Sequence, residues 1–195
     1  MATYAKHYDI IVVGAGHAGC EAALAAARMG CRVLLLAIDL DKVAAMPCSP
    51  SIGGMAKGQL VREIDALGGE MAKITDLTAI QYKTLNTKKG PAVQSSRTQN
   101  DKKRYHMAMK AALERQPKLD LKQSLVERLV VEDGRVVGVE DHTGFAFQAG
   151  AVILATGTFL SGLVHIGFKS IQAGRAGEFA AYGLAGSLAG IGLSL

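Results

Sequence analysis

The stretch Tyr8-Asp9-Ile10-Ile11-Val12-Val13-Gly14-Ala15-Gly16-His17-Ala18-Gly19 decides the fold of this 195-residue chain. Its first half is a β-branched run that ends in glycine, which is typical of a buried parallel strand. Its second half reads G-x-G-x-x-G. An alanine-rich helix is predicted over residues 20–29 and a second strand over residues 32–36, so the glycine pattern lies within one βαβ unit.

The three glycines of this turn have separate tasks in a dinucleotide-binding unit. Gly14 permits the tight turn, Gly16 lets the backbone approach a pyrophosphate, and Gly19 lets the helix pack closely on the strand. Free N–H groups at the start of the helix, together with the helix dipole, then face the phosphates. The alternative is a glycine-rich turn without a ligand, but the βαβ context favours a binding site.

An acidic residue about 20 positions after the turn completes the pattern, because it binds a ribose hydroxyl. Asp39 stands at this distance from Gly19, whereas Ala37 occupies the position directly after the predicted strand. Two interpretations stay open. Asp39 or Asp41 reaches the ribose, or either residue caps the next segment.

Composition and charge indicate a globular chain of one domain, or of one domain and part of another. Hydrophobic residues make up 49% of the sequence and charged residues 20%, and tryptophan is absent, so Val, Leu, Ile and Ala must supply the core. The net charge of +5 favours a polyanionic partner, although ordinary solubilising charge explains it equally simply.

Cysteine and histidine usage points to a reduced, cytoplasmic protein without a metal site. Cys20, Cys31 and Cys48 form no CxxC pair, and the five histidines are isolated. The N-terminus lacks the pattern of a signal peptide. Residues 179–195 are uncharged, but this run is short for a membrane span and contains four glycines, so we expect a buried segment and no membrane association.

The order of the remaining predicted elements defines the fold class. A helix is predicted over residues 56–67, a strand over 80–85, a helix that a capping box at 98–101 opens and Pro117 ends, and a third parallel strand over 119–122. Short strands at 125–132, 135–141 and 145–149 form an antiparallel meander, because Asp133-Gly134 is a hairpin signal. A buried strand at 151–154 then leads into Ala155-Thr156-Gly157.

This order predicts an α/β fold of the FAD/NAD(P)-binding Rossmann-like class. It combines a parallel sheet, a GxGxxG βαβ unit and an antiparallel β-meander as the crossover. A plain NAD domain uses a helical crossover where this chain has the meander. A meander followed by Ala-Thr-Gly resembles the two-dinucleotide-binding flavoproteins, and this resemblance favours FAD over NAD as the cofactor.

Several longer motifs resemble one particular family, MnmG, also called GidA. They are GHAGCEAA at 16–23, MPCSPSIGG at 46–54, KGQLVREIDALGG at 57–69, KGPAV at 89–93, GTFLSG at 157–162 and GRAGE at 174–178. The resemblance runs from Tyr8 to the C-terminus. It implies a FAD-dependent tRNA modification enzyme that acts with the GTPase MnmE to install a (carboxymethyl)aminomethyl group at C5 of the wobble uridine. It also implies methylene-folate as one-carbon donor, NADH as reductant and a homodimer.

Carried over to this sequence, the resemblance implies a set of cofactor-binding residues. They are Gly14, Ala15, Gly16, His17, Ala18 and Gly19 of the turn, Val126 in the first meander strand and Ala181 after the last motif. The family can have serine near position 181, so alanine leaves only a backbone contact there. Members are much longer than this chain. Residues 1–195 therefore match a truncated, N-terminal portion of the FAD-binding domain, without the NADH-binding insertion and the C-terminal helical domain.

Cys48 is the candidate catalytic residue. Pro47 and Pro50 stiffen the loop that carries it, and Gly53-Gly54 lets the backbone pass close to a cofactor. The resemblance suggests that its thiolate adds to C6 of the uracil ring and so makes C5 nucleophilic. The alternative is a small apolar residue that fills a turn, as we expect for Cys20 and Cys31.

A basic run and two other functional classes complete the expectations. The run comprises Lys88, Lys89, Arg97, Lys102, Lys103 and Arg104, and it is either a tRNA phosphate contact or, for residues 102–104, a solvated helix face. The alternative functions are a FAD-dependent small-molecule oxidoreductase that resembles fumarate reductase, and an inactive nucleotide-binding fragment.

Overall fold

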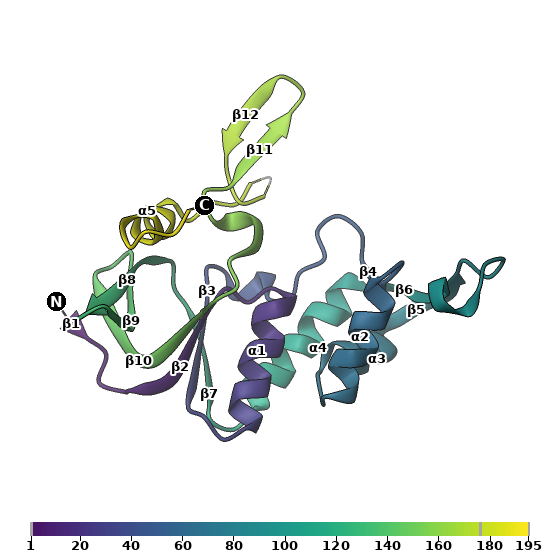
Figure 1. Ribbon diagram of the computed structural model, residues 1–195, viewed down its shortest axis with the longest axis horizontal. Helices are drawn as coiled ribbons and strands as arrows, with labels where there is room; N and C mark the ends of the chain where they lie inside the picture. Colours follow the sequence, from purple (N-terminus) through teal and green to yellow (C-terminus); the bar gives the residue numbers. More distant parts are fainter. Residues whose placement is uncertain (1, 176, 195) are drawn as a thin grey trace.

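A mixed seven-stranded sheet forms the body of the protein in the computed structural model, which describes residues 2–175 and 177–194 (Figure 1). The strand order is β7-β3-β2-β10-β9-β8, and β1 pairs beside β10. The strands are β1 (Ala2–Thr3), β2 (Tyr8–Val13), β3 (Val33–Ala37), β7 (Leu119–Gln123), β8 (Val126–Glu132), β9 (Arg135–Asp141) and β10 (Phe145–Leu154). The predicted fold class is confirmed.

The parallel half of the sheet is buried on both faces. β2 pairs in parallel with β3 and β10, and β3 pairs in parallel with β7. Along β2 and β3, alternate side chains enter two different cores. Val12 and Leu35 belong to the core beneath the helices α1 (His17–Arg28) and α4 (Lys102–Arg115), whereas Ile11 belongs to the core on the meander side.

The predicted meander is present, with one correction. The strands expected at 145–149 and 151–154 are a single strand, β10, whose first part pairs antiparallel to β9 and whose last part pairs parallel to β2. Gly150 does not interrupt it, because the strand changes partners there without leaving the sheet. Helix α5 (Tyr182–Gly190) packs on β8 and buries Leu184 and Leu188.

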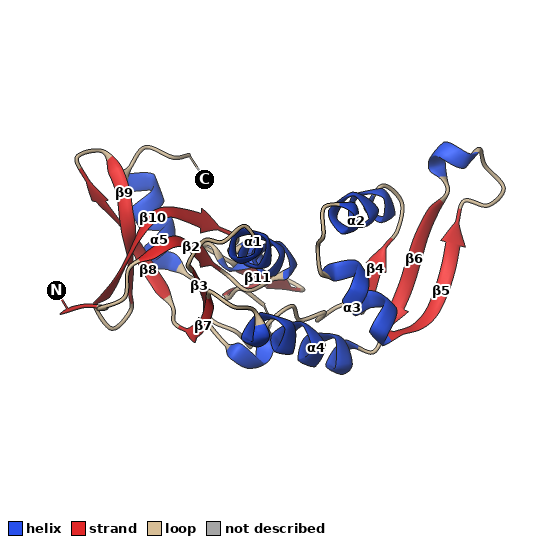
Figure 2. Ribbon diagram, turned by 90° about the horizontal axis from the view of Figure 1, so that it is seen from below, coloured by secondary structure: helices blue, strands red, loops and turns tan. Residues whose placement is uncertain are grey.

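A second unit, here called the arm, lies beside the helices of the body. It consists of β4 (Ser51–Gly53), α2 (Lys57–Ala66), α3 (Met71–Thr78), β5 (Ala79–Leu85) and β6 (Ser95–Asn100), with the sheet order β4-β6-β5. Figure 2 shows the β5–β6 hairpin extending away from the body. Short 3₁₀ turns are η1 (Leu40–Lys42), η2 (Pro91–Val93) and η3 (Gly157–Phe159).

The arm contains the largest departures from the sequence prediction. α2 and β5 were expected, but β4, α3 and β6 were not. The predicted capping box at 98–101 is wrong, because Thr98 lies within β6. Asp101 caps α4 alone: its carboxylate accepts hydrogen bonds from the backbone N–H groups of Lys103 and Arg104.

The last elements and the composition of the core complete the description. A small hairpin, β11 (Leu163–Ile166) and β12 (Lys169–Gln172), stands apart from the body in Figure 1. No helix within the described residues is long and apolar enough to cross a membrane. The aliphatic core was expected, but fully buried Tyr8, Tyr105 and Met109 add larger side chains to it.

Candidate dinucleotide-binding site

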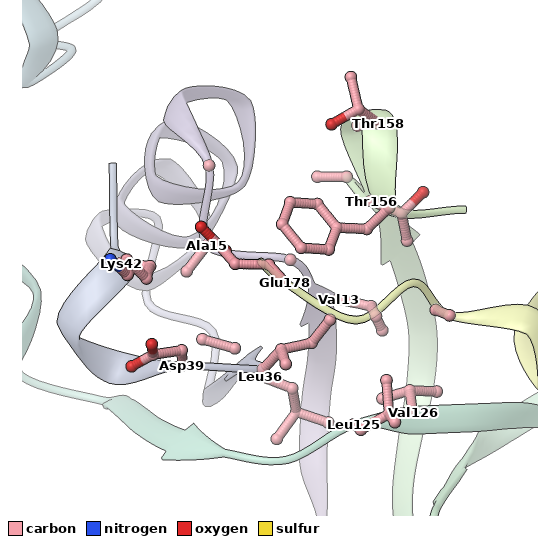
Figure 3. A pocket seen from close by; sticks show the side chains of 18 of the residues that line it. Val13, Ala15, Leu36, Asp39, Lys42, Leu125, Val126, Thr156, Thr158 and Glu178 are labelled. Atoms are coloured by element: carbon pink, nitrogen blue, oxygen red, sulfur yellow. The ribbon is translucent and has the colours of Figure 1, made fainter. Parts of the chain in front are cut away.

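A pocket of about 270 Å³ opens where β2, β3 and β10 end (Figure 3). The turn at residues 14–16, the segment after β3, the start of β8 and residues 155–159 line it. Parallel strands bind ligands at their carboxyl ends, and a helix N-terminus at this edge favours a phosphate group. Most of the wall is apolar, with a few polar groups, as is usual for cofactor sites.

Glycine is required at position 14 by its backbone conformation and by the space around it. Its φ of 102° lies in the region that residues with a side chain rarely adopt. Its N–H donates to the Leu36 carbonyl at 2.8 Å. A Cβ on Gly14 would lie 2.4 Å from the Ala155 carbonyl oxygen. The turn is therefore fixed between β3 and the segment that follows β10.

Gly16 and Gly19 differ in how much space surrounds them. A Cβ on Gly16 would have no atom within 4 Å, so the backbone is accessible there, whereas a Cβ on Gly19 would lie 1.8 Å from the Gly14 carbonyl oxygen. Gly19 thus serves the close packing of helix on turn, and Gly16 lies on the open side. Gly16 is also the N-cap of α1 and supplies no side-chain cap, so the first N–H groups of the helix are available for an anion.

The other residues of the turn differ in position. Ala15 lines the pocket, and its carbonyl accepts a hydrogen bond from the Ala44 N–H at 2.8 Å. Ala18 is exposed on the first turn of α1. His17 points into the protein, where burial lowers the pKa of its imidazole and its ring lies 5.6 Å from the ring of Tyr105. The structure therefore does not place His17, Ala18 or Gly19 in the pocket wall.

Asp39, Val126 and Ala181 line the pocket together, although they are far apart in the sequence. The capping interpretation of Asp39 is confirmed, because its carboxylate accepts from the Asp41 N–H at 2.8 Å at the start of η1. Asp39 also lines the pocket, and its contact with a ribose hydroxyl stays a prediction. Asp41 instead forms an ion pair with Lys110. Figure 3 shows Asp39 and Val126 on the walls around Val13 and Leu36.

Cys48 lies next to the pocket but does not line it. Pro47 and Ala45 belong to the wall, while Cys48 is exposed in the irregular segment between η1 and β4. Pairing with β6 fixes this segment, because the Pro50 carbonyl accepts from the Asn100 N–H at 2.6 Å. Cys20 is different: burial raises the pKa of its thiol to about 12, so it is unreactive at neutral pH.

The pocket side chains that sequence reasoning missed include Lys42, Phe159, Arg175 and Glu178. Three of them lie in the motifs at 157–162 and 174–178, which were recognised without assigning these residues a role. Ala176 of the second motif lies outside the described residues. No group of three possible metal ligands occurs within residues 2–175 and 177–194.

The fold and the pocket define a class of protein, namely the Rossmann-like proteins that bind FAD or NAD(P) at a glycine-rich turn, with a meander as crossover. Comparisons with known proteins identify the family within this class. Residues 9–195 match the family model described as "Glucose inhibited division protein A". The chain therefore belongs to the GidA family.

Particular relatives show how much of the family's length this chain represents. It is 68% identical over 188 residues to the tRNA uridine 5-carboxymethylaminomethyl modification enzyme MnmG of Syntrophobacter fumaroxidans, covering 96% of this chain and 29% of that protein. The form I crystal structure of Aquifex aeolicus GidA matches with a TM-score of 0.93 and 49% identity, covering 97% of this chain and 31% of that one.

A third similar protein is shorter than the other two. The GidA-related protein from Thermus thermophilus matches with a TM-score of 0.71 and 27% identity, covering 96% of this chain and 69% of that one. The chain thus spans about 30% of the length of the MnmG relatives that it matches.

Proposed function

We propose that this chain is the cofactor-holding part of a FAD-dependent enzyme that modifies the wobble uridine of tRNA at C5 with a (carboxymethyl)aminomethyl group. The supporting observation is a formed dinucleotide pocket in a chain that is 68% identical to an enzyme named for this modification. Residues 1–195 are then the N-terminal portion of the FAD-binding domain. We expect the NADH site, the helical region that meets the GTPase MnmE and the remaining flavin contacts to lie outside residues 1–195.

The residues present fit FAD. The uncapped start of α1 and the accessible backbone at Gly16 suit a pyrophosphate, and Asp39 suits a ribose hydroxyl. Val126 and Ala181 are buried to 2% and 4% exposure and form an apolar wall that suits an adenine ring. When bound, FAD supplies redox chemistry; this chain's own residues bind it, orient it and exclude water from its phosphates.

Cys48 is proposed to act on the uracil ring. Its thiolate adds to C6, the new bond being Sγ–C6, and the electron pair of the C5–C6 double bond moves toward the C4 carbonyl, so that C5 becomes nucleophilic. The position of Cys48 supports this role, because it is exposed and directly follows Pro47 of the pocket wall. A methylene-folate supplies the one-carbon unit, and NADH supplies the reducing equivalents. The full-length protein acts in the cytoplasm as a homodimer.

Two other functions make different demands on the chain. A fumarate-reductase-like oxidoreductase needs a cluster of arginine and histidine side chains beside the flavin to bind a small acid. His165 does not fit this need, because it lies on the separate β11–β12 hairpin and is hydrogen-bonded to Ser170 at 3.0 Å. An inactive nucleotide-binding fragment needs only the pocket. A test of function must therefore supply the rest of a family member.

A chimera provides this test. Residues 1–195 replace the corresponding part of the Syntrophobacter fumaroxidans relative, and the chimera is produced in bacteria that lack their own gene. We expect mass spectrometry of tRNA nucleosides to show the modified wobble uridine again. The variant C48S should bind flavin but abolish the modification, whereas the matched C31S variant should retain both. Modification by the C48S chimera would remove Cys48 from the mechanism, and a folded, flavin-bound but inactive wild-type chimera would refute the proposed function.

A further inference from the structure

Arg175 lies in the pocket wall with a buried donor that has no acceptor. Its Nε atom is one of four buried side-chain nitrogen and oxygen atoms in the described part of the chain that make no hydrogen bond. Such groups are rare in native proteins, because a buried donor without an acceptor has lost its hydrogen bonds to water and gained none in return. The other three atoms belong to His17, Thr75 and Tyr105, which do not line the pocket.

The rest of the guanidinium is held firmly. Nη2 of Arg175 donates to a carboxylate oxygen of Glu178 at 2.7 Å, and the guanidinium carbon lies 5.1 Å from the centre of the Phe159 ring. The Phe159 ring itself is fixed against Gly174, because a Cβ on Gly174 would lie 2.2 Å from it. The side chain of Arg175 retains 20% exposure, and it therefore presents a restrained cation to the pocket.

The backbone around Arg175 is equally constrained. The Gly174 N–H donates to the Glu178 carbonyl at 3.0 Å and the Glu178 N–H to the Arg175 carbonyl at 3.0 Å, and Thr158 donates its hydroxyl to the Gly174 carbonyl at 2.9 Å. The motifs at 157–162 and 174–178 thus form one folded unit. Its two charged pocket residues are Arg175 and Glu178, and Figure 3 shows Glu178 among the residues around the pocket.

We propose that Arg175 is a further ligand-binding residue, whose guanidinium donates to a phosphate oxygen of the bound dinucleotide while Glu178 and Phe159 hold the side chain in place. A phosphate oxygen is the acceptor that best matches an unpaired guanidinium N–H, since charge-assisted hydrogen bonds are the strongest available to it. The pairing also explains the arginine: lysine keeps the charge but lacks the planar fork that bonds Glu178 and the ligand at once. This inference rests on the proposed function only in taking FAD as the ligand.

The test uses the chimera with the Syntrophobacter fumaroxidans relative, freed of bound flavin, and three ligands: FAD, ADP and adenosine. We expect the variant R175K to bind FAD and ADP about ten- to a hundredfold more weakly than the wild-type chimera, because one charge-assisted hydrogen bond is lost. Adenosine, which has no phosphate, should bind both chimeras equally. The matched control is R128K, because Arg128 forms a comparable pair with Glu140 on β8 and β9, away from the pocket, and its affinities should not change.

Three outcomes decide the matter. A purely structural role predicts that R175K lowers the melting temperature while the affinity for ADP stays the same, and this result would overturn the inference. An equal loss of ADP and adenosine binding would also overturn it, since the phosphate would not be the partner. If the wild-type chimera binds ADP but not FAD, the proposed cofactor fails, whereas a selective loss of ADP binding in R175K still supports Arg175 as a phosphate ligand.

Discussion

The body and the arm of this protein are stabilised in different ways. In the body, β2 and β3 contribute side chains to a core on each face, and Ile11, Val12, Leu34 and Leu35 are fully buried. In the arm, β5 is exposed along most of its length, with Ile80 at 69% and Tyr82 at 60% exposure. The body is thus rigid by burial on both faces, whereas the arm is attached through Ile52 and Ile74, which pack in the core beneath α1 and α4, and through polar contacts to α1.

Polar contacts tie the start of α3 to α1. The Glu21 carboxylate of α1 accepts hydrogen bonds from the backbone N–H groups of Glu70 and Met71, at the start of α3. Arg28, also on α1, pairs with the Glu70 side chain and donates to the Gly68 carbonyl at 2.7 Å. Local opening is therefore expected to be easier in the arm than in the sheet, because regions with little apolar burial open at low free energy.

The largest expected effect comes from removing an isoleucine side chain in each region. Ile11→Ala deletes a fully buried side chain between Leu34 and Val152 and should lower the free energy of unfolding by about 2–5 kcal/mol. Ile80→Ala changes an exposed side chain of the arm and should stay within about 0.5 kcal/mol. Urea unfolding measures both. Equal losses would show that the arm and the body do not differ in this way.

Much of the body follows from the sequence, for a physical reason. Residues 8–37 form their βαβ unit from local signals: a β-branched run, a glycine turn and an alanine-rich helix. Asp39 and Val126 were also assigned to the site from motif position and resemblance, and both line the pocket.

The arm could not be predicted in the same way. β4 has only three residues, and it exists because Ser51 and Gly53 pair with Gln99 and Arg97 of β6. That pairing joins segments more than 40 residues apart, so no local pattern reveals it. The role of Arg175 could not be predicted from the sequence either, because its unpaired Nε depends on how Phe159 and Glu178 pack around it in the folded chain.

A smaller effect is expected from cutting the link between the two regions. Glu21→Ala removes the carboxylate that caps the start of α3 and should cost about 0.5–2 kcal/mol, as for other helix caps. Hydrogen exchange should locate the loss: the amides of α3 exchange faster, while those of β2 and β3 keep their protection. Faster exchange throughout the sheet would mean that Glu21 supports the body as well.

A pH-dependent effect concerns the buried thiol of Cys20 in the body. Burial raises the pKa of this thiol from 9.0 to about 12, so the native state favours the neutral thiol. Because the native pKa is the higher one, this contribution to stability is fully present below pH ~9 and is lost as the pH rises toward 12. Unfolding measured at about pH 8 and about pH 11 should show a decrease at the higher pH, and the decrease should be smaller in C20A. An identical decrease in C20A would assign the pH dependence to other groups.

The smallest perturbation compares Cys20 with Cys48, which lies in the irregular segment between η1 and the arm. Cys48 is exposed and Cys20 is buried, so iodoacetamide should modify Cys48 in the native state and Cys20 only on unfolding. Mass spectrometry of the two peptides at increasing reaction times measures both rates. Equal alkylation of both thiols in the folded protein would show that α1 opens readily, and the rigidity assigned to the body would be wrong.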